Sequence, residues 1–147
     1  MNDKPIIAID PGASGGFAWI DRDGLVSAEP MPDGMTAICD RLRGLACISR
    51  HAVVEKVGGY MPGNSGPAAA TFARHCGHIE AALYCHCVAT EQVTPQKWMK
   101  ALGTWPKDKA ERKHAIRDAM QRRYPHLKVT LKTADALGIL TYAIKHA

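Results

Sequence analysis

The first thirty residues alternate short apolar runs with turn-forming residues, a pattern typical of antiparallel strands. Apolar runs at 5–10 and 17–20 predict two strands, and the tetrapeptide DRDG at 21–24 predicts a tight turn into a third strand at 25–29. Because short turns join antiparallel neighbours, we expect these three strands to form a meander.

Beyond this meander, segments with helical spacing alternate with compact apolar runs. The expected helices are 35–49, 68–84, one that begins at Thr94, 107–123 and 133–145, and the expected strands are 52–57 and 85–90, with a Gly- and Pro-rich loop at 58–67. Strands that are joined through helices pair in parallel. We therefore expect an α/β fold in which a mixed five-stranded sheet, part antiparallel meander and part parallel, carries helices packed on it.

Composition limits the class of protein. The chain has 147 residues, of which 46% are hydrophobic and 22% charged, as expected for one folded domain over 1–147. No apolar run approaches the roughly 20 residues of a membrane span, and none near the start is typical of a signal peptide. The five cysteines are an odd number. We therefore expect a cytoplasmic protein with free thiols and no membrane partner.

The net charge of +5 is concentrated in one segment of the chain. Residues 107–123 contain seven Lys or Arg and three Asp or Glu. Within it, Lys109, Lys113 and Arg117 are spaced at i, i+4 and i+8, so they form one basic stripe if the segment is helical. Such a stripe favours a polyanionic partner, nucleic acid before membrane, although a solvated helix face has the same pattern.

Three acidic residues lie at positions that favour a catalytic or metal-binding role. Asp10 ends the first strand before Pro-Gly, Glu55 lies among valines in a strand expected to be covered on both sides, and Asp135 comes shortly after Thr133, a candidate helix cap. Taken singly, each has a structural alternative: a turn cap for Asp10, an ion pair with a Lys or Arg for Glu55, and a favourable first-turn charge for Asp135.

Together the three acids predict a metal site. Two strand positions and one helix start can converge at one edge of a sheet, and carboxylate oxygens without Cys or His suit Mg²⁺ or Mn²⁺. Beside a basic segment, such a cluster predicts phosphodiester hydrolysis with two metal ions.

The motifs, taken in order, resemble those of RuvC-type Holliday junction resolvases of the RNase H-like superfamily, especially the RuvC-like proteins of phages and mobile elements. The matching stretches are IIAIDPGASGG (6–16), VVEKV (53–57), MPGNSG (61–66), TPQKWMKALG (94–103), a Lys-rich helix, and ADALGIL (134–140). They cover nearly the whole chain, and the resemblance implies an RNase H-like fold.

The resemblance also implies an activity, namely a homodimeric, metal-dependent endonuclease that nicks four-way DNA junctions in recombination and repair, without a nucleotide cofactor. Asp10, Glu55 and Asp135 match the acidic positions of the family. The expected DNA contacts are Tyr60 and Met61 in the loop after Glu55, and the phosphate-binding residues Lys97, Lys100, Lys107, Lys109 and Lys113.

One position departs from the family pattern. RuvC-type enzymes commonly carry Asp, or His in some relatives, three residues before the last Asp, and this chain has Lys132 there. The site could use three acids, another residue could fill the position, or the protein could be a junction-binding protein with weak or no catalysis. These alternatives stay open at the level of sequence.

Other signals carry less weight. The clusters at 75–78 and 85–87 contain His and Cys, but their spacing is untidy for zinc, and buried thiols explain the cysteines more simply. Trp98, Leu102 and Trp105 are expected to pack the C-terminal helices, with base stacking by Trp105 as the alternative. A sugar-kinase or actin-like ATPase would need two such domains, which 147 residues do not supply.

Overall fold

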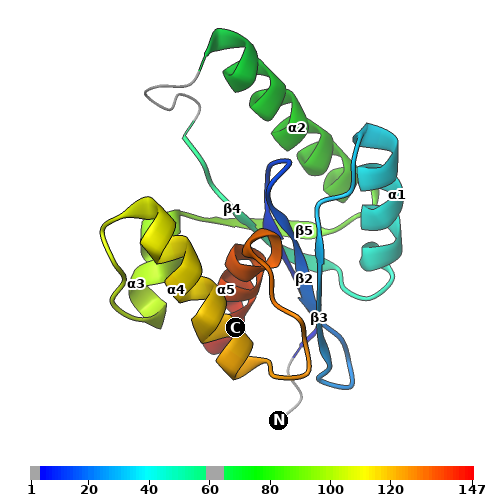
Figure 1. The fold of residues 1–147 in the computed structure, drawn as a ribbon. Helices are drawn as coiled ribbons and strands as arrows, with labels where there is room; N and C mark the ends of the chain where they lie inside the picture. The colour runs from blue at the N-terminus through cyan, green and yellow to red at the C-terminus, as the bar shows by residue number, and fades with distance from the viewer. Residues whose placement is uncertain (1–3, 59–64) are drawn as a thin grey trace.

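The computed structural model describes residues 4–58 and 65–147, which form a five-stranded mixed sheet with helices on both faces (Figure 1). The strands are β1 (Ile6–Asp10), β2 (Gly16–Ile20), β3 (Val26–Pro30), β4 (His51–Glu55) and β5 (Ala89–Val93), and the helices are α1 (Met35–Ala46), α2 (Gly66–Cys85), α3 (Pro95–Leu102), α4 (Lys109–Arg123) and α5 (Leu131–His146). The strand order is β3-β2-β1-β4-β5, antiparallel among β1 to β3 and parallel among β1, β4 and β5. The predicted fold class is confirmed. No helix within the described ranges is long and apolar enough to cross a membrane.

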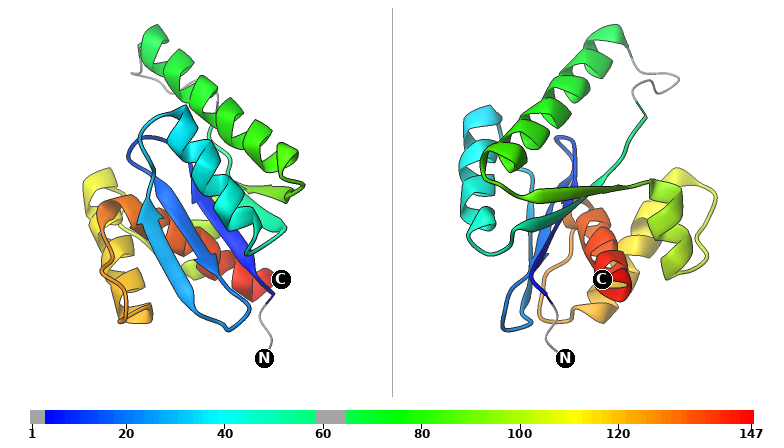
Figure 2. Two further views of the ribbon diagram at one scale, coloured as in Figure 1. Left: turned by 90° about the vertical axis from the view of Figure 1, so that its right-hand side faces the viewer. Right: turned by 180° about the vertical axis from the view of Figure 1, so that it is seen from behind.

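Two hydrophobic cores lie on opposite faces of the sheet. Helices α1 and α2 cover one face, and α3, α4 and α5 cover the other (Figures 1 and 2). Because successive strand residues point to opposite faces, Ile6 and Ala8 of β1 contribute to the core beneath α5, and Asp10 shares their face. Val53 of β4 belongs to the same core, so Glu55 also points to the α5 face. Simple strand alternation thus places both acids on one side.

The strand register brings those two acids to the same end of the sheet. Ile9 of β1 is paired with Val54 of the parallel strand β4, and Asp10 and Glu55 are the next residues of the two strands. The carboxyl ends of adjacent parallel strands therefore carry the two acids side by side.

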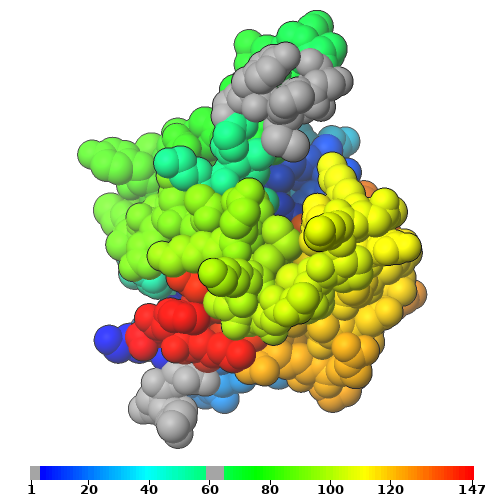
Figure 3. Space-filling model, turned by 90° about the vertical axis from the view of Figure 1, so that its left-hand side faces the viewer, coloured from blue at the N-terminus to red at the C-terminus, as the bar shows by residue number. Residues whose placement is uncertain are grey.

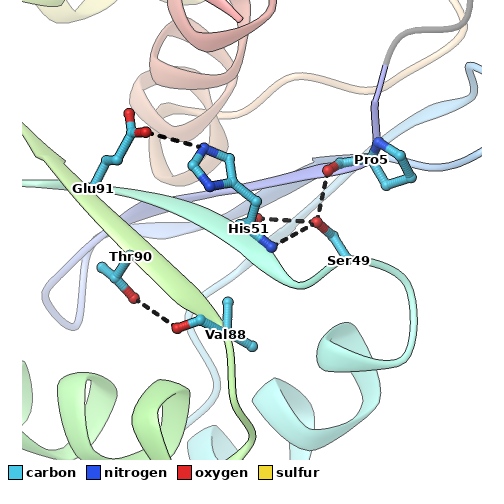
Figure 4. Close-up of polar contacts among 6 residues, drawn as sticks. All are labelled: Pro5, Ser49, His51, Val88, Thr90 and Glu91. Atoms are coloured by element: carbon cyan, nitrogen blue, oxygen red, sulfur yellow. Dashed lines mark hydrogen bonds and ion pairs between the residues drawn. The ribbon is translucent and has the colours of Figure 1, made fainter.

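The opposite end of the sheet is held by polar contacts (Figure 4). Ser49 Oγ donates a hydrogen bond to the carbonyl oxygen of Pro5 (2.7 Å) and accepts one from the His51 N–H group (3.0 Å). His51 Nε2 lies 3.7 Å from Glu91 Oε1 on β5. These contacts connect the residue before β1 with the start of β4, and the start of β4 with the middle of β5.

The predicted strand at 85–90 is wrong in position, since β5 spans Ala89–Val93. Helix α2 continues through Cys85, because its buried stripe extends to Leu83. The chain then turns at Cys87, whose φ of 56° is left-handed, and enters the strand only afterwards. The sequence pattern did not predict this turn because residues 85–88 include no Gly or Pro.

The last helix starts earlier than predicted. Thr130 is its N-cap, and Thr133, which the sequence indicated as the cap, is the third helical residue of a reciprocal capping arrangement. Asp135 is therefore the fifth residue of α5 and lies beyond the first turn. A favourable first-turn charge does not account for an acid at this position.

Candidate active site

A cleft of about 890 Å³ opens where the carboxyl ends of β1 and β4 face α5 and α4. In Figure 3, residues near the end of β1 (blue) lie in a hollow between α4 (yellow) and the segment after β4 (blue-green). The cleft is lined by the acids Asp10, Glu55 and Asp135, by the loop 11–15, and by the cationic residues Lys109, Arg112 and Lys113 of α4. The three acids that were predicted to converge thus share one cleft.

Asp10 is positioned by the glycine-containing loop that follows it. A Cβ at Gly15 would lie 2.0 Å from the Asp10 carbonyl oxygen, and Gly12 has a φ of 117°, so both positions need glycine for the loop to fold back. Burial raises the pKa of Asp10 well above its ordinary value, with smaller contributions from the charges of Glu55 and Asp135. The carboxylate is thus poorly solvated and lies close to two like charges.

Glu55 is held by an indole. Trp98 Nε1 donates a hydrogen bond of 2.7 Å to Glu55 Oε2, and the Trp98 side chain is itself fully buried. Burial raises the pKa of Glu55 to about 7, while the bond from Trp98 acts in the opposite direction. The predicted alternative, an ion pair with a nearby Lys or Arg, is not among the contacts of the described residues.

Asp135 contributes the third carboxylate from α5. Burial raises its pKa, and the positive charges of Lys113 and Arg112 lower it. Three desolvated, mutually repelling carboxylates form a donor set that a hard divalent cation would stabilise, so these residues fit Mg²⁺ or Mn²⁺. Within residues 4–58 and 65–147, however, no three His, Cys, Asp or Glu side chains are gathered tightly enough to hold one ion. The acids share the cleft without forming a closed single-ion cage.

The predicted DNA contacts fall into four groups. Lys109 and Lys113 line the cleft, whereas Arg117, one turn further along α4, forms an ion pair of 3.0 Å with Asp118. Three further lysines are exposed and lie outside the lining of the cleft: Lys97, Lys100 and Lys107. Tyr60 and Met61 lie outside the described residues.

Lys132 lies in the first turn of α5 with an exposed side chain. A Cβ at Gly16 would come within 2.7 Å of the Lys132 carbonyl oxygen, so this turn lies directly on the start of β2. The residue is not part of the cleft lining. The cation that acts on all three acids is Lys113, which lowers the pKa of each.

Two supporting residues were not recognised from the sequence. Trp98 was expected only to pack the C-terminal helices, which it does, as do Leu102 and Trp105, but it also donates to Glu55. His75, considered there for zinc, accepts a hydrogen bond of 2.8 Å at Nε2 from the Gly12 N–H group in the loop beside Asp10. The sequence held little evidence for these two roles, because only the tertiary fold brings Trp98 to Glu55 and His75 to the loop after Asp10.

Comparisons with protein-family models and with curated protein sequences found no match. The solved structures that are similar in fold include two of RuvC. The Thermus thermophilus RuvC structure in complex with a Holliday junction substrate has a TM-score of 0.61 and 17% identity, over 97% of this chain and 94% of that one. A second Thermus thermophilus RuvC structure has a TM-score of 0.58 and 17% identity, over 97% and 95%. Nearly the full length of the chain, including all five strands and the elements that carry the three acids, therefore adopts a RuvC-like fold.

Proposed function

We propose that the protein is a divalent-metal-dependent endonuclease that nicks four-way DNA junctions and acts as a homodimer in recombination and repair. The observation that carries the proposal is the convergence of Asp10, Glu55 and Asp135 in one cleft bordered by the cationic face of α4. The RuvC-like fold supports the proposal, since one similar structure is a RuvC bound to a Holliday junction. Lys109 and Arg112 would hold backbone phosphates on the rim of the cleft.

The residues of the cleft define the chemistry. Asp10, Glu55 and Asp135 would hold Mg²⁺ or Mn²⁺, and such an ion would supply charge stabilisation at the phosphate and would make the attacking water more acidic. In the hydrolysis, the water oxygen bonds to phosphorus and the bond from phosphorus to O3′ breaks with its electrons on O3′. The water gives up one proton and O3′ gains one, which leaves a 5′-phosphate and a 3′-hydroxyl. No side chain needs to act as a nucleophile.

The test is cleavage of an end-labelled four-way junction beside a linear duplex of matching sequence, in Mg²⁺, in Mn²⁺ and in chelator. We expect paired symmetric nicks in the junction alone and only with metal. Asp10→Asn and Glu55→Gln remove a negative charge, so they are expected to abolish cleavage. Because both variants preserve side-chain shape, they are expected to retain junction binding. Cleavage that persists in either variant would overturn the metal-site assignment, and equal cleavage of the linear duplex would overturn junction selectivity.

A second candidate is a junction-binding protein with little catalysis, which the lysine at position 132 favours. In that case the wild-type protein binds junctions without producing nicks in either metal. Lys132→Asp, which places an acid on the exposed first turn of α5, should then raise cleavage from this low level. Unchanged activity in Lys132→Asp would count against this explanation.

A further inference from the structure

One large apolar ring lies in the cleft without belonging to a hydrophobic core. Among the described residues, Phe72 is the only aromatic one that lines the cleft, and it is part of neither core, whether as a buried residue or as a half-buried one packed against it. The buried residues of α2 begin only at Ile79. The first half of this helix, which carries Phe72, extends beyond the sheet (Figures 1 and 2). Core packing therefore does not account for a phenylalanine at this position.

The Phe72 ring is held beside the loop that follows Asp10. A Cβ at Gly12 would lie 3.4 Å from Cε2 of Phe72, so the ring packs directly on this glycine. The His75 ring lies nearly parallel to the Phe72 ring, at 26° with 6.4 Å between centroids, and its Nε2 accepts the hydrogen bond from the Gly12 N–H group. Phe72 is half-buried. These contacts give the ring a defined place in the cleft, next to a loop residue only two positions after Asp10.

The cleft offers a DNA strand two different kinds of surface. Lys109, Arg112 and Lys113 line it from α4, whereas Phe72 lines it from α2, which lies on the opposite face of the sheet. Cationic side chains bind backbone phosphates, and the face of an accessible aromatic ring binds a nucleobase by stacking. A groove that combines the two is typical of proteins that bind strands with unstacked bases. The cleft therefore has the chemistry to bind both the phosphate and the base of a nucleotide.

We propose that Phe72 binds a nucleobase by stacking and so selects DNA in which a base near the scissile phosphate is free to leave its own stack. A base within a continuous duplex does not fit, because its neighbours cover both of its faces, whereas a branched or unpaired strand can supply one. The inference rests on the proposed nuclease function and deepens it, since it names the part of the substrate that α2 recognises. None of the DNA contacts predicted from the sequence lies on this helix.

The experiment combines a substitution in the protein with a missing base in the DNA. Four-way junctions that carry a single abasic site, placed in turn at each nucleotide around the branch, are titrated with protein in chelator. We expect one position at which the missing base weakens wild-type binding by about tenfold, as for the loss of one stacked base. Phe72→Leu keeps an apolar contact with Gly12 but has no stacking surface. It should bind the intact junction about tenfold more weakly and lose less than about twofold more at that position.

Two further variants separate stacking from packing. Phe72→Tyr keeps an aromatic face of the same size, so it should bind the intact junction within about threefold of the wild type and remain sensitive to the abasic site. Tyr84→Leu is the matched control, because it removes an exposed aromatic ring from the other end of α2, outside the cleft lining. Its affinity for every junction should equal that of the wild type.

Equal losses at every abasic position in the wild type and in Phe72→Leu would overturn the inference. Wild-type affinity of Phe72→Leu for the intact junction would overturn it too, as would an equal loss in Phe72→Tyr and Phe72→Leu, since a ring that stacks must be replaceable by another ring. These results are distinct from failure of the proposed function, in which the wild type produces no junction nicks in any metal. Binding in chelator requires no cleavage, so the titrations would still decide the role of Phe72.

Discussion

Trp98 connects the buried core to the acidic cleft, because its indole Nε1 donates a hydrogen bond of 2.7 Å to Glu55 Oε2 while its rings are fully buried against α5. A bond from a neutral donor to a carboxylate stabilises the charged form, so Trp98 favours ionised Glu55 in a site where burial disfavours it. Trp98 is thus a positioning residue: it orients Glu55 and adjusts its acidity without itself lining the cleft.

Replacing Trp98 with Phe should raise the pKa of Glu55 above about 7, since the stabilising donor is lost and the burial stays. We expect Mn²⁺ affinity at neutral pH to fall, and the acidic limb of the pH–rate profile for cleavage to move to higher pH. Trp105→Phe is the matched control, because Trp105 Nε1 donates to the Met99 carbonyl oxygen and not to a cleft carboxylate. An equal displacement in both variants would indicate a general loss of packing.

Gly138 of α5 packs against the ring of Trp98, so a substitution there tests how closely Trp98 is held. A Cβ at this position would lie 2.5 Å from Cζ3 of Trp98, a ring with no free space around it. Gly138→Ala should therefore destabilise the protein by about 1–3 kcal/mol through overpacking. Gly77→Ala in α2 is the opposite case, since nothing lies within 4 Å of its Cβ, and it should stabilise by about 0.5–1 kcal/mol.

Urea unfolding followed by circular dichroism measures both changes. Gly138→Ala should also weaken Mn²⁺ binding, because a displaced Trp98 no longer holds Glu55, while Gly77→Ala leaves Mn²⁺ binding unchanged. If Gly138→Ala and Gly77→Ala both stabilised the protein, Trp98 would have to move aside freely, contrary to its close packing against Gly138.

His75 supports the loop beside Asp10. To accept the Gly12 N–H bond at Nε2, the ring must be neutral with its proton on Nδ1, and burial lowers the pKa of His75 in agreement with a neutral ring. His75→Leu leaves the Gly12 amide without its acceptor and should destabilise the protein by about 1 kcal/mol. His75→Gln can still accept and should lose less.

Hydrogen exchange of the Gly12 amide, followed by NMR, is the direct measurement. We expect its protection to disappear in His75→Leu and to persist in His75→Gln, with His78→Leu as a control one turn along α2. Retained protection in His75→Leu would contradict the role given to this ring.

The sequence predicted the features that depend on local periodicity. Strand alternation, the turn at 21–24 and the acids Asp10 and Glu55 could all be read from neighbouring residues, and the sheet places the acids as expected. The residues that support these acids could not be predicted from neighbouring residues, since Trp98 is 43 residues from Glu55 and His75 is 63 residues from Gly12 along the chain. Such pairs arise only when separate helices pack on the sheet.

The difference between Lys113 and Arg117 has the same origin. Both belong to the basic stripe predicted at i, i+4 and i+8, and the spacing treats them alike. Lys113 lines the cleft that holds the acids, whereas Arg117, one turn further along the same stripe, lies outside the cleft lining and pairs with Asp118. Which turn of a helix borders the cleft depends on its tertiary contacts, and a stripe of charge alone does not fix it.

The raised pKa of Glu55 predicts a pH-dependent stability of the metal-free protein. Glu55 has a pKa of about 7 when folded against an ordinary value of 4.5, so between these values the folded state holds a proton that the unfolded chain has released. Stability from this group is therefore fully present below pH 4.5 and is lost as pH rises through 7. A shift of this size corresponds to about 3 kcal/mol, and the raised pKa values of Asp10 and Asp135 act in the same direction.

The measurement is the free energy of unfolding in chelator from about pH 5 to about pH 8, for the wild type and for Glu55→Gln. Gln is neutral at every pH and keeps an acceptor for Trp98, so the wild type should lose more stability with rising pH than this variant. At the alkaline end, saturating Mg²⁺ should restore about 2–3 kcal/mol to the wild type, because the cation binds the ionised carboxylates, and less to Glu55→Gln. Parallel curves for the two proteins in chelator would mean that burial does not disfavour the Glu55 charge, and the electrostatic basis for a cation in this cleft would be lost with it.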